Sequence, residues 1–127
     1  MPNEIAMLYE VGKVLEVDGK VSTIEIHQEF SDALYKIDTQ EYLLILFWIP
    51  LSRDVLKVHP CGDTNNPVRG VFSTRSPMRP NNIGVTEVRL LERTGNIIKV
   101  EGLDAFEGTS VIDIKNSKGT RYGDKHH

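Results

Sequence analysis

The sequence predicts an all-β protein, mostly a small antiparallel β-barrel with a short helix. Apolar and polar residues alternate over several short segments, and turn-forming residues such as Asp18-Gly19 and Thr94-Gly95-Asn96 separate these segments. The chain contains no βαβ repeat and no GxGxxG, which argues against a Rossmann fold. Its 127 residues fit one domain with one core.

The first half of the chain predicts a hairpin, a short helix and a central strand. Strands over 11–17 and 21–26 flank Asp18-Gly19, a strong hairpin signal. Ser31 is placed to cap a short helix through residues 32–36. Residues 42–49 are continuously apolar, which is typical of a strand buried on both faces, and Pro50 ends them.

The second half predicts a loop, a second hairpin and a closing strand. Residues 60–69 are rich in Gly, Asn and Pro and read as loop, and Val71-Phe72 as a short strand. Residues 84–92 and 96–100 form the second hairpin, and residues 111–115 close the sheet. About seven strands with short connections favour a barrel or a sandwich.

Composition predicts a cytoplasmic protein with no membrane anchor. No apolar run approaches the roughly 20 residues needed to cross a bilayer, and the first residues lack the basic region of a signal peptide. A single cysteine, Cys61, excludes an internal disulfide and fits a reducing compartment. We expect residues 116–127 to be a flexible tail, and we exclude the terminal Lys125-His126-His127 from functional reasoning.

The most informative stretch is residues 67–84, which carry Arg75-Ser-Pro-Met-Arg79-Pro-Asn-Asn. Pro77 and Pro80 restrict the residues before them, so Ser76 and Arg79 are held extended. A stiff loop with two guanidiniums suits an anionic or carboxylate-bearing ligand. The alternative is a surface loop with solvated arginines.

Charge is uneven along the chain, although the net charge is only −3. Five basic and two acidic residues lie between Arg53 and Arg79, so one face can be positive while the total is negative. A scattered, solvated surface explains the charge equally well.

Metal and nucleophile signals are weak. His59-x-Cys61 offers two ligands where a metal site needs more, and His27 adds no paired spacing. His59 and Cys61 are neighbours in sequence, and this does not give them the facing geometry of a catalytic dyad. We therefore expect Cys61 to be a loop thiol, and we expect no metal.

Three acids lie close together in sequence. Asp104 and Glu107 fall in a loop between strands, where turn residues are the alternative interpretation. Asp113 lies in an apolar strand, and we expect it to pair with an arginine such as Arg75 or Arg89. Phe47 and Trp48 are core residues or, alternatively, a wall of an adenine pocket.

Three motifs then occur in a characteristic order. They are His59-Pro60-x-Gly62, the stretch from Gly70 to Gly84, and Gly102-Leu-Asp104-Ala-Phe-Glu107-Gly108-Thr109-x-Val-Ile-Asp113-Ile-Lys115. Together they resemble the TsaA-like family, the tRNA methyltransferase O group. That family reads roughly HPxG, GVFATRSPxRPNPIGLS and DxxDGTPVLDIKP.

The resemblance implies an S-adenosylmethionine-dependent enzyme that methylates N6 of threonylcarbamoyladenosine beside the tRNA anticodon. It also implies a homodimer with the cofactor near the subunit interface. The implied cofactor-binding residues are Arg75, Val85, Pro50, Leu51 and the loop Asp104, Ala105, Phe106, Glu107 and Gly108. Candidate proton acceptors are Asp104, Glu107 and His59, and candidate substrate-binding residues are Arg79 and Asn81.

The chain departs from the family pattern in several places. Pro50-Leu51 stands where the family has His-Glu beside the cofactor, and Asn82 replaces the second proline of RPNP. Glu107, Ser110 and Asn116 replace an Asp and two prolines. We also expect no extra carboxy-terminal domain. The alternative functions are a non-catalytic dimeric module that binds S-adenosylmethionine or a nucleotide, and a methyltransferase for another substrate.

Overall fold

The computed structural model describes residues 2–119, which form two compact units. One unit contains residues up to Phe47 together with those from Val85 onward, and the other contains Trp48–Gly84. Each is described separately below. The terminal Lys125-His126-His127 and most of the expected tail lie outside the described residues.

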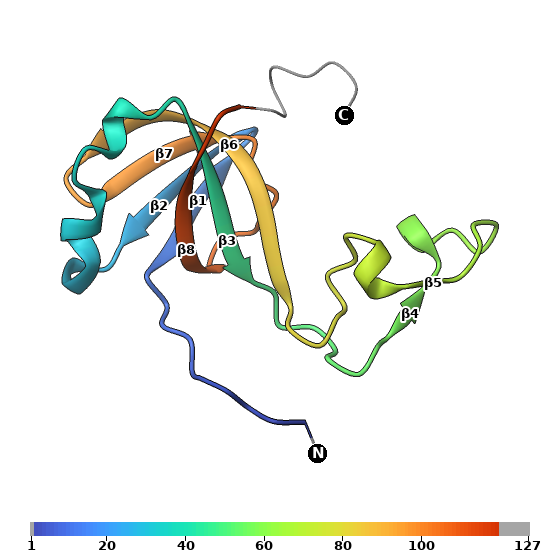
Figure 1. The fold of residues 1–127 in the computed structure, drawn as a ribbon. Helices are drawn as coiled ribbons and strands as arrows, with labels where there is room; N and C mark the ends of the chain where they lie inside the picture. The colour runs from blue at the N-terminus through green and yellow to red at the C-terminus, as the bar shows by residue number, and fades with distance from the viewer. Residues whose placement is uncertain (1, 120–127) are drawn as a thin grey trace. The chain divides into compact units, whose positions relative to one another are not determined.

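The first unit is built around a closed antiparallel barrel, which confirms the predicted fold class (Figure 1). The strand order is β1-β2-β7-β6-β3-β8, and β8 also pairs with β1. The strands are β1 (Gly12–Asp18), β2 (Val21–Ile26), β3 (Tyr42–Trp48), β6 (Ile83–Thr94), β7 (Ile97–Glu101) and β8 (Ser110–Ser117). Closure leaves no unpaired edge, which spares the barrel exposed backbone donors and acceptors.

Both predicted hairpins are present, with each turn centred on a glycine and the residue after it. Asp18 pairs with Val21, so Gly19 and Lys20 form the first turn, one residue later than Asp18-Gly19. Thr94 pairs with Ile97 across Gly95 and Asn96. Gly19 and Gly95 have φ of 60° and 61°, a conformation that glycine adopts without a Cβ clash.

The barrel interior is filled by alternate residues of the strands. Completely or almost completely buried are Val14, Ile24, Leu43, Ile45, Val88, Ile98, Val100 and Val111. The expectation that residues 42–49 are buried on both faces is wrong. In β3 only Leu43, Ile45 and Phe47 are buried, and the residues between them are half-exposed, because a barrel wall has one inner face.

The connection between β2 and β3 corrects the predicted helix. It contains two short 3₁₀-helices, η1 (Gln28–Leu34) and η2 (Ile37–Thr39), and the N-cap of η1 is His27 with no side-chain cap. Ser31 lies inside η1 and does not cap it. Leu34 in η1 and Ile37 in η2 are the buried residues of these two helices.

The second unit contains only short elements. These are β4 (Lys57–Val58), η3 (Pro60–Gly62), β5 (Arg69–Gly70) and η4 (Val71–Ser73), with β4 and β5 antiparallel. Val71-Phe72 was predicted as a strand and is instead a 3₁₀ turn. Val71 is buried, whereas Phe72 is 81% exposed. No helix within residues 2–119 has the length and apolar character needed to cross a membrane.

The segment before β1 is tied to the barrel by Glu10. Its carboxylate accepts hydrogen bonds from His27 Nε2 at 2.7 Å and from Ser110 Oγ. The Ser110 bond and, next, the His27 bond lower the pKa of Glu10 below its ordinary value. Tyr9 adds a tilted ring contact with Phe30, with centroids 6.0 Å apart.

Gly12→Ala is predicted to destabilise the barrel. A Cβ there would lie 2.6 Å from the carbonyl oxygen of Glu25 and 2.9 Å from Ile26 Cδ1, so β1 and β2 would have to separate. The free energy of unfolding should fall by about 1–3 kcal/mol in urea denaturation. Gly70→Ala is the control, because the nearest atom to its Cβ is 3.9 Å away. Equal stability of the two variants would contradict this close approach.

Glu10→Gln is predicted to lower stability near neutral pH and to remove part of its pH dependence. A carboxylate whose folded pKa is lowered contributes stability above its unfolded pKa, and this is lost as the pH falls through the folded pKa. The loss at pH 7 should be about 0.5–1.5 kcal/mol because Glu10 is partly exposed. Wild type and variant should converge as the pH falls through the lowered folded pKa of Glu10; a difference that stays constant across the whole acid range would refute the role of ionised Glu10.

Candidate functional site

Arg53 and Asn82 close the base of the unit formed by Trp48–Gly84. Arg53 donates from Nε to the Pro80 carbonyl at 2.6 Å and from a terminal nitrogen to Asn81 Oδ1 at 3.1 Å. Its guanidinium also lies 6.0 Å from the centre of the Trp48 ring. These contacts join the start of the unit to residues almost thirty positions later.

Asn82 makes the second set of contacts and is completely buried. Its amide nitrogen donates to the carbonyls of Ser52, at 3.0 Å, and Pro77, at 2.8 Å. The backbone carbonyl of Asn82 accepts from the amide of Ile49 at 2.8 Å, whereas the buried side-chain Oδ1 has no hydrogen-bond partner among the described residues. A proline, which the family pattern has here, offers no side-chain donor. The departure from the family pattern at this position therefore provides side-chain bonds that a proline could not make.

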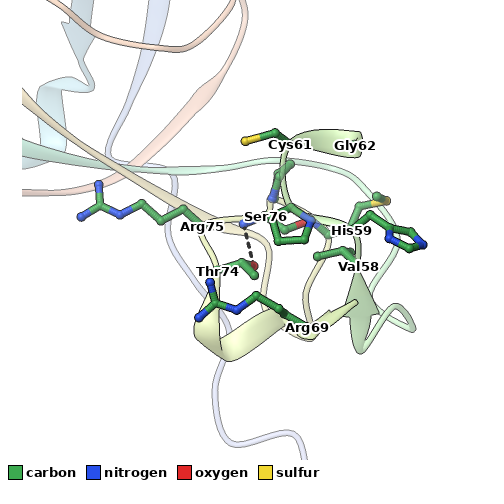
Figure 2. Close-up of a pocket in the computed structure, with 11 residues that line it drawn as sticks. Val58, His59, Cys61, Gly62, Arg69, Thr74, Arg75 and Ser76 are labelled. Atoms are coloured by element: carbon green, nitrogen blue, oxygen red, sulfur yellow. Dashed lines mark hydrogen bonds between the residues drawn. The ribbon is translucent and has the colours of Figure 1, made fainter. Parts of the chain in front are cut away.

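The loop between Thr74 and Met78 is built from successive side-chain turns. Thr74 Oγ1 accepts from the amide of Ser76 at 3.1 Å, and Ser76 Oγ accepts from the amide of Met78 at 3.3 Å (Figure 2 shows the first of these). Thr74 Oγ1 also donates to the Val71 carbonyl at 2.9 Å. Hydroxyls that bond to nearby backbone groups in this way favour turns. Together with Pro77, they fix the path of the loop.

Arg79 completes this loop as a structural residue. Its guanidinium donates to three backbone carbonyls, those of Thr74 (3.3 Å), Ser76 (2.9 Å) and Val71 (3.3 Å). Three of its five N–H groups are thereby used within the loop. The prediction that Arg79 binds substrate stays a prediction, with the remaining two donors available for it.

Arg75 differs from Arg79 in having no partner among the described residues. Its side chain is exposed, and Figure 2 shows it extended away from His59. It lines a pocket of about 490 Å³ together with His59, Cys61, Arg69, Thr74 and Ser76. No acidic side chain lines this pocket, so its fixed charges are positive. Such a pocket favours an anionic group.

His59 presents one defined nitrogen acceptor in its neutral form. Its Nδ1 lies 2.9 Å from the carbonyl oxygen of Asn66, and because a carbonyl only accepts, Nδ1 carries the proton. Nε2 of the neutral ring is then an acceptor. The ring orientation is supported by Asn66, whose amide donates to the Pro60 carbonyl at 2.8 Å.

The loop after β7 carries the remaining candidate residues in the barrel unit. Its backbone is fixed to β1, since the amide of Gly108 donates to the Val14 carbonyl and the amide of Val14 donates to the Thr109 carbonyl. Gly108 has a φ of 85° and Leu103 is buried. With its ends held in this way, the loop exposes Asp104, Phe106 and Glu107 to solvent, Phe106 by 85%.

The predicted site residues therefore fall in both units. Within the second unit, His59 and Arg75 line the same pocket, while Asn81 is bonded to Arg53 at the base. Pro50 and Leu51 follow β3 in that unit. Val85 and the loop Asp104–Gly108 belong to the barrel unit. Sequence reasoning missed Arg53 and Asn82, although the departure from RPNP at Asn82 was visible as a signal.

Two further expectations are resolved by the geometry. Asp113 lies 3.3 Å from Lys115 and accepts a bond from the amide of Ile114, so its ionic partner is a neighbouring lysine rather than Arg75 or Arg89. Cys61 is a free, exposed thiol, as predicted. Across residues 2–119, His, Cys, Asp and Glu side chains form no group of three or more suited to a metal ion.

These features define a class: a small antiparallel barrel that carries, in a long excursion between β3 and β6, a rigid loop with a free arginine. A family model described as the tRNA-methyltransferase O N-terminal domain matches residues 13–118. The chain belongs to this family, which confirms the resemblance seen in its motifs.

Several archaeal proteins are similar to the chain. An S-adenosyl-L-methionine-binding protein of Archaeoglobus fulgidus is 49% identical over 96 residues, which cover 75% of this chain and 68% of that protein. A probable S-adenosyl-L-methionine-binding protein of Methanocaldococcus jannaschii is 39% identical over 107 residues, 80% and 85% of the two chains. A further probable S-adenosyl-L-methionine-binding protein of Archaeoglobus is 50% identical, but the chain spans only 26% of its length.

Solved structures share the fold. The crystal structure of TrmO from Pseudomonas aeruginosa matches with a TM-score of 0.70 and 22% identity, over 99% of this chain and 61% of that one. Another TrmO crystal structure gives 0.71 and 24%, over 98% and 62%. The chain thus spans about three fifths of these proteins.

Arg79→Ala is predicted to loosen the loop around Arg75. It removes donors from three backbone carbonyls in a partly buried position, and the free energy of unfolding should fall by about 1–3 kcal/mol. Amide hydrogen exchange in residues 71–82 should accelerate. Arg69→Ala, which removes an exposed arginine, is the control with no change. Unchanged exchange in Arg79→Ala would show that the loop does not depend on this guanidinium.

Proposed function

We propose that this protein binds S-adenosylmethionine and methylates tRNA at N6 of threonylcarbamoyladenosine beside the anticodon. The observation that carries the proposal is the contrast between the two motif arginines. Arg79 is used to hold the loop, and Arg75 is presented from it with all its donors free of described partners. A rigid loop that presents one free guanidinium suits a carboxylate, such as the methionyl carboxylate of this cofactor.

The comparisons support the cofactor and the reaction class. The related archaeal proteins are named as S-adenosyl-L-methionine-binding proteins, and the matching family is named for a tRNA methyltransferase. The charge distribution supports an RNA substrate. Trp48–Gly84 carries five basic and two acidic residues, whereas the rest of the chain carries ten basic and sixteen acidic ones. A locally basic unit suits the phosphates of RNA.

The residues present fit the chemistry of this cofactor. In the unit formed by Trp48–Gly84, Arg75 would hold the carboxylate. In the barrel unit, considered by itself, the exposed ring of Phe106 is an aromatic face of the kind that stacks on adenine. Asp104 and Glu107 are exposed carboxylates that can accept bonds from ribose hydroxyls or from the methionyl amine. The family resemblance also implies cofactor contacts from Val85, Ala105 and Gly108 in the barrel unit and from Pro50 and Leu51 in the other unit. Pro50-Leu51 cannot supply the ionic contacts of a His-Glu pair.

The bound cofactor supplies an electrophilic methyl group on a sulfonium. The chain must then align the acceptor nitrogen with that methyl and accept the proton that the nitrogen loses. His59 is suited to this role because its Nε2 is an acceptor while Asn66 holds Nδ1. Asp104 and Glu107 are the other candidates. Asn81 and the free donors of Arg79 would contact the threonyl carboxylate or a phosphate.

The direct test is methyl transfer from labelled S-adenosylmethionine to tRNA that carries threonylcarbamoyladenosine, read by nucleoside mass spectrometry. Label should appear in N6-methylated threonylcarbamoyladenosine and not in tRNA that lacks the modification. Saturable cofactor binding with no transfer to either tRNA would refute the enzymatic proposal.

That negative result would favour the second candidate, a non-catalytic S-adenosylmethionine-binding module. The specific observation behind it is Pro50-Leu51, which replaces two polar residues of the family pattern beside the cofactor. The relatives' names describe binding rather than catalysis. Transfer to a different nucleoside would instead identify a methyltransferase for another substrate.

We also propose a homodimer, as the family resemblance implies, and a cytoplasmic location, which the single cysteine favours. The outward residues of β3, Leu44, Leu46 and Trp48, are apolar and half-exposed, and they offer a surface for a second copy. Light scattering of the purified protein should give twice the mass of the chain. A monomer at high micromolar concentration would refute the dimer.

Arg75→Ala is predicted to weaken cofactor binding without destabilising the fold. Loss of a charge-assisted bond should cost about 1.5–3 kcal/mol, an affinity loss of roughly 10- to 150-fold by calorimetry. The midpoint of urea unfolding should not change, because Arg75 bonds to no described residue. Arg75→Lys keeps the charge and should recover only part of the affinity. Unaltered affinity in Arg75→Ala would remove this residue from the site.

A further inference from the structure

Phe72 is placed in solvent by the local fold of η4. The turn begins after β5, and the amide of Val71 donates to the Leu56 carbonyl at 2.9 Å while the Val71 side chain is 2% exposed. The Val71 carbonyl in turn accepts from the amide and hydroxyl of Thr74 and from Arg79. The backbone amide, the backbone carbonyl and the side chain of Val71 are therefore all in contact with other residues. The next residue, Phe72, is 81% exposed.

The ring of Phe72 has most of its apolar surface in contact with water. Burial of such a ring is worth about 1.5–3 kcal/mol, and Phe72 forgoes most of it in the free protein. Ser73, beside it, donates its hydroxyl to the Gly70 carbonyl at 2.8 Å, so the turn that presents the ring is itself ordered. The ring is presented on a fixed support rather than on a frayed end.

The surroundings of Phe72 are cationic. Arg69 lies three residues before it and Arg75 three residues after it, and both are exposed with no bond to a described residue. Figure 2 shows both guanidinium groups extended away from the His59 ring. The unit has an excess of three positive charges, whereas the barrel unit and the termini are acidic. The partner of this surface is therefore expected to be an anion with flat apolar groups.

We propose that Phe72 is a stacking platform for an unpaired base of the tRNA anticodon loop, with Arg69 on the adjacent phosphate. This deepens the proposed function and rests on it. Single-stranded RNA is recognised by aromatic rings that stack on bases and by cations on the backbone. Because Phe72 precedes Arg75 by three residues, the stacked base lies close to the residue proposed to hold the methyl donor. Phe72 thereby positions the anticodon loop of the tRNA and takes no part in the methyl transfer.

The experiment measures binding of a labelled anticodon stem–loop RNA to the full chain by fluorescence anisotropy. Phe72→Ala should weaken binding by about tenfold, which is within the range for one stacked base, and Phe72→Trp should restore it. Phe72→Leu, which keeps apolar area without the aromatic face, should not. Tyr35→Ala is the matched control, because Tyr35 is 79% exposed in the acidic unit and should not affect binding.

Two further measurements separate stacking from other roles. Phe72→Ala should leave affinity for a fully paired RNA duplex unchanged, since a duplex offers no unpaired base, and it should leave S-adenosylmethionine affinity unchanged. Arg69→Ala should lower the slope of log affinity against log salt by about one phosphate contact.

Each contrary outcome has a distinct meaning. If the wild-type chain binds the stem–loop and Phe72→Ala binds equally well, stacking is refuted while the proposed function stands. A second contrary outcome is that Phe72→Ala dissociates a dimer while the resulting monomer binds RNA as tightly as the wild type. The ring then belongs to a protein interface, and the stacking proposal fails. If the wild-type chain binds no RNA, the proposed function fails and the platform with it.

Discussion

The side chain of Asn82 is the constraint on which the geometry of the arginine loop depends. Completely buried, it donates to the carbonyls of Ser52 and Pro77 and so connects the two chain segments at the base of the second unit. This unit has few buried apolar residues, Val71 being the main one described, so burial alone cannot order it. Bonds between side chains and backbone carbonyls replace a core, and removal of one donor leaves a buried acceptor unsatisfied.

The arginines of this unit divide into two kinds, and the division follows from the donor chemistry of the guanidinium. Arginine has five donors and no acceptor, so it can order a loop only where carbonyl oxygens converge. Arg53 and Arg79 meet such carbonyls and hold the base and the loop. Arg69 and Arg75 meet none among the described residues and remain available to an anion. Stability and ligand binding are therefore assigned to different arginines of one short segment, which makes the two effects separable by mutation.

Sequence patterns predicted the barrel better than the loop, for physical reasons. Alternation and glycine turns are local signals, and they located both hairpins to within a residue. The continuous apolar run 42–49 has no period, so it gave no indication that β3 buries one face only. The resemblance located Arg75 and Arg79 but could not distinguish them. That distinction rests on the bonds from Arg79 to the carbonyls of Val71, Thr74 and Ser76, which converge only along the folded path of the loop. The sequence predicts a strand at Val71-Phe72 because two adjacent apolar residues give no sign of which one is exposed. The exposure of Phe72 follows from the burial of Val71, which is a tertiary contact.

The central claim is that the loop 71–82 binds S-adenosylmethionine through Arg75. Hydrogen–deuterium exchange with and without the cofactor tests this most directly, because it reports on the loop without a mutation. The loop should gain protection at saturating cofactor, while β1 and β2 should not change. Protection confined to other segments, or no change in this loop while calorimetry shows binding, would contradict the account.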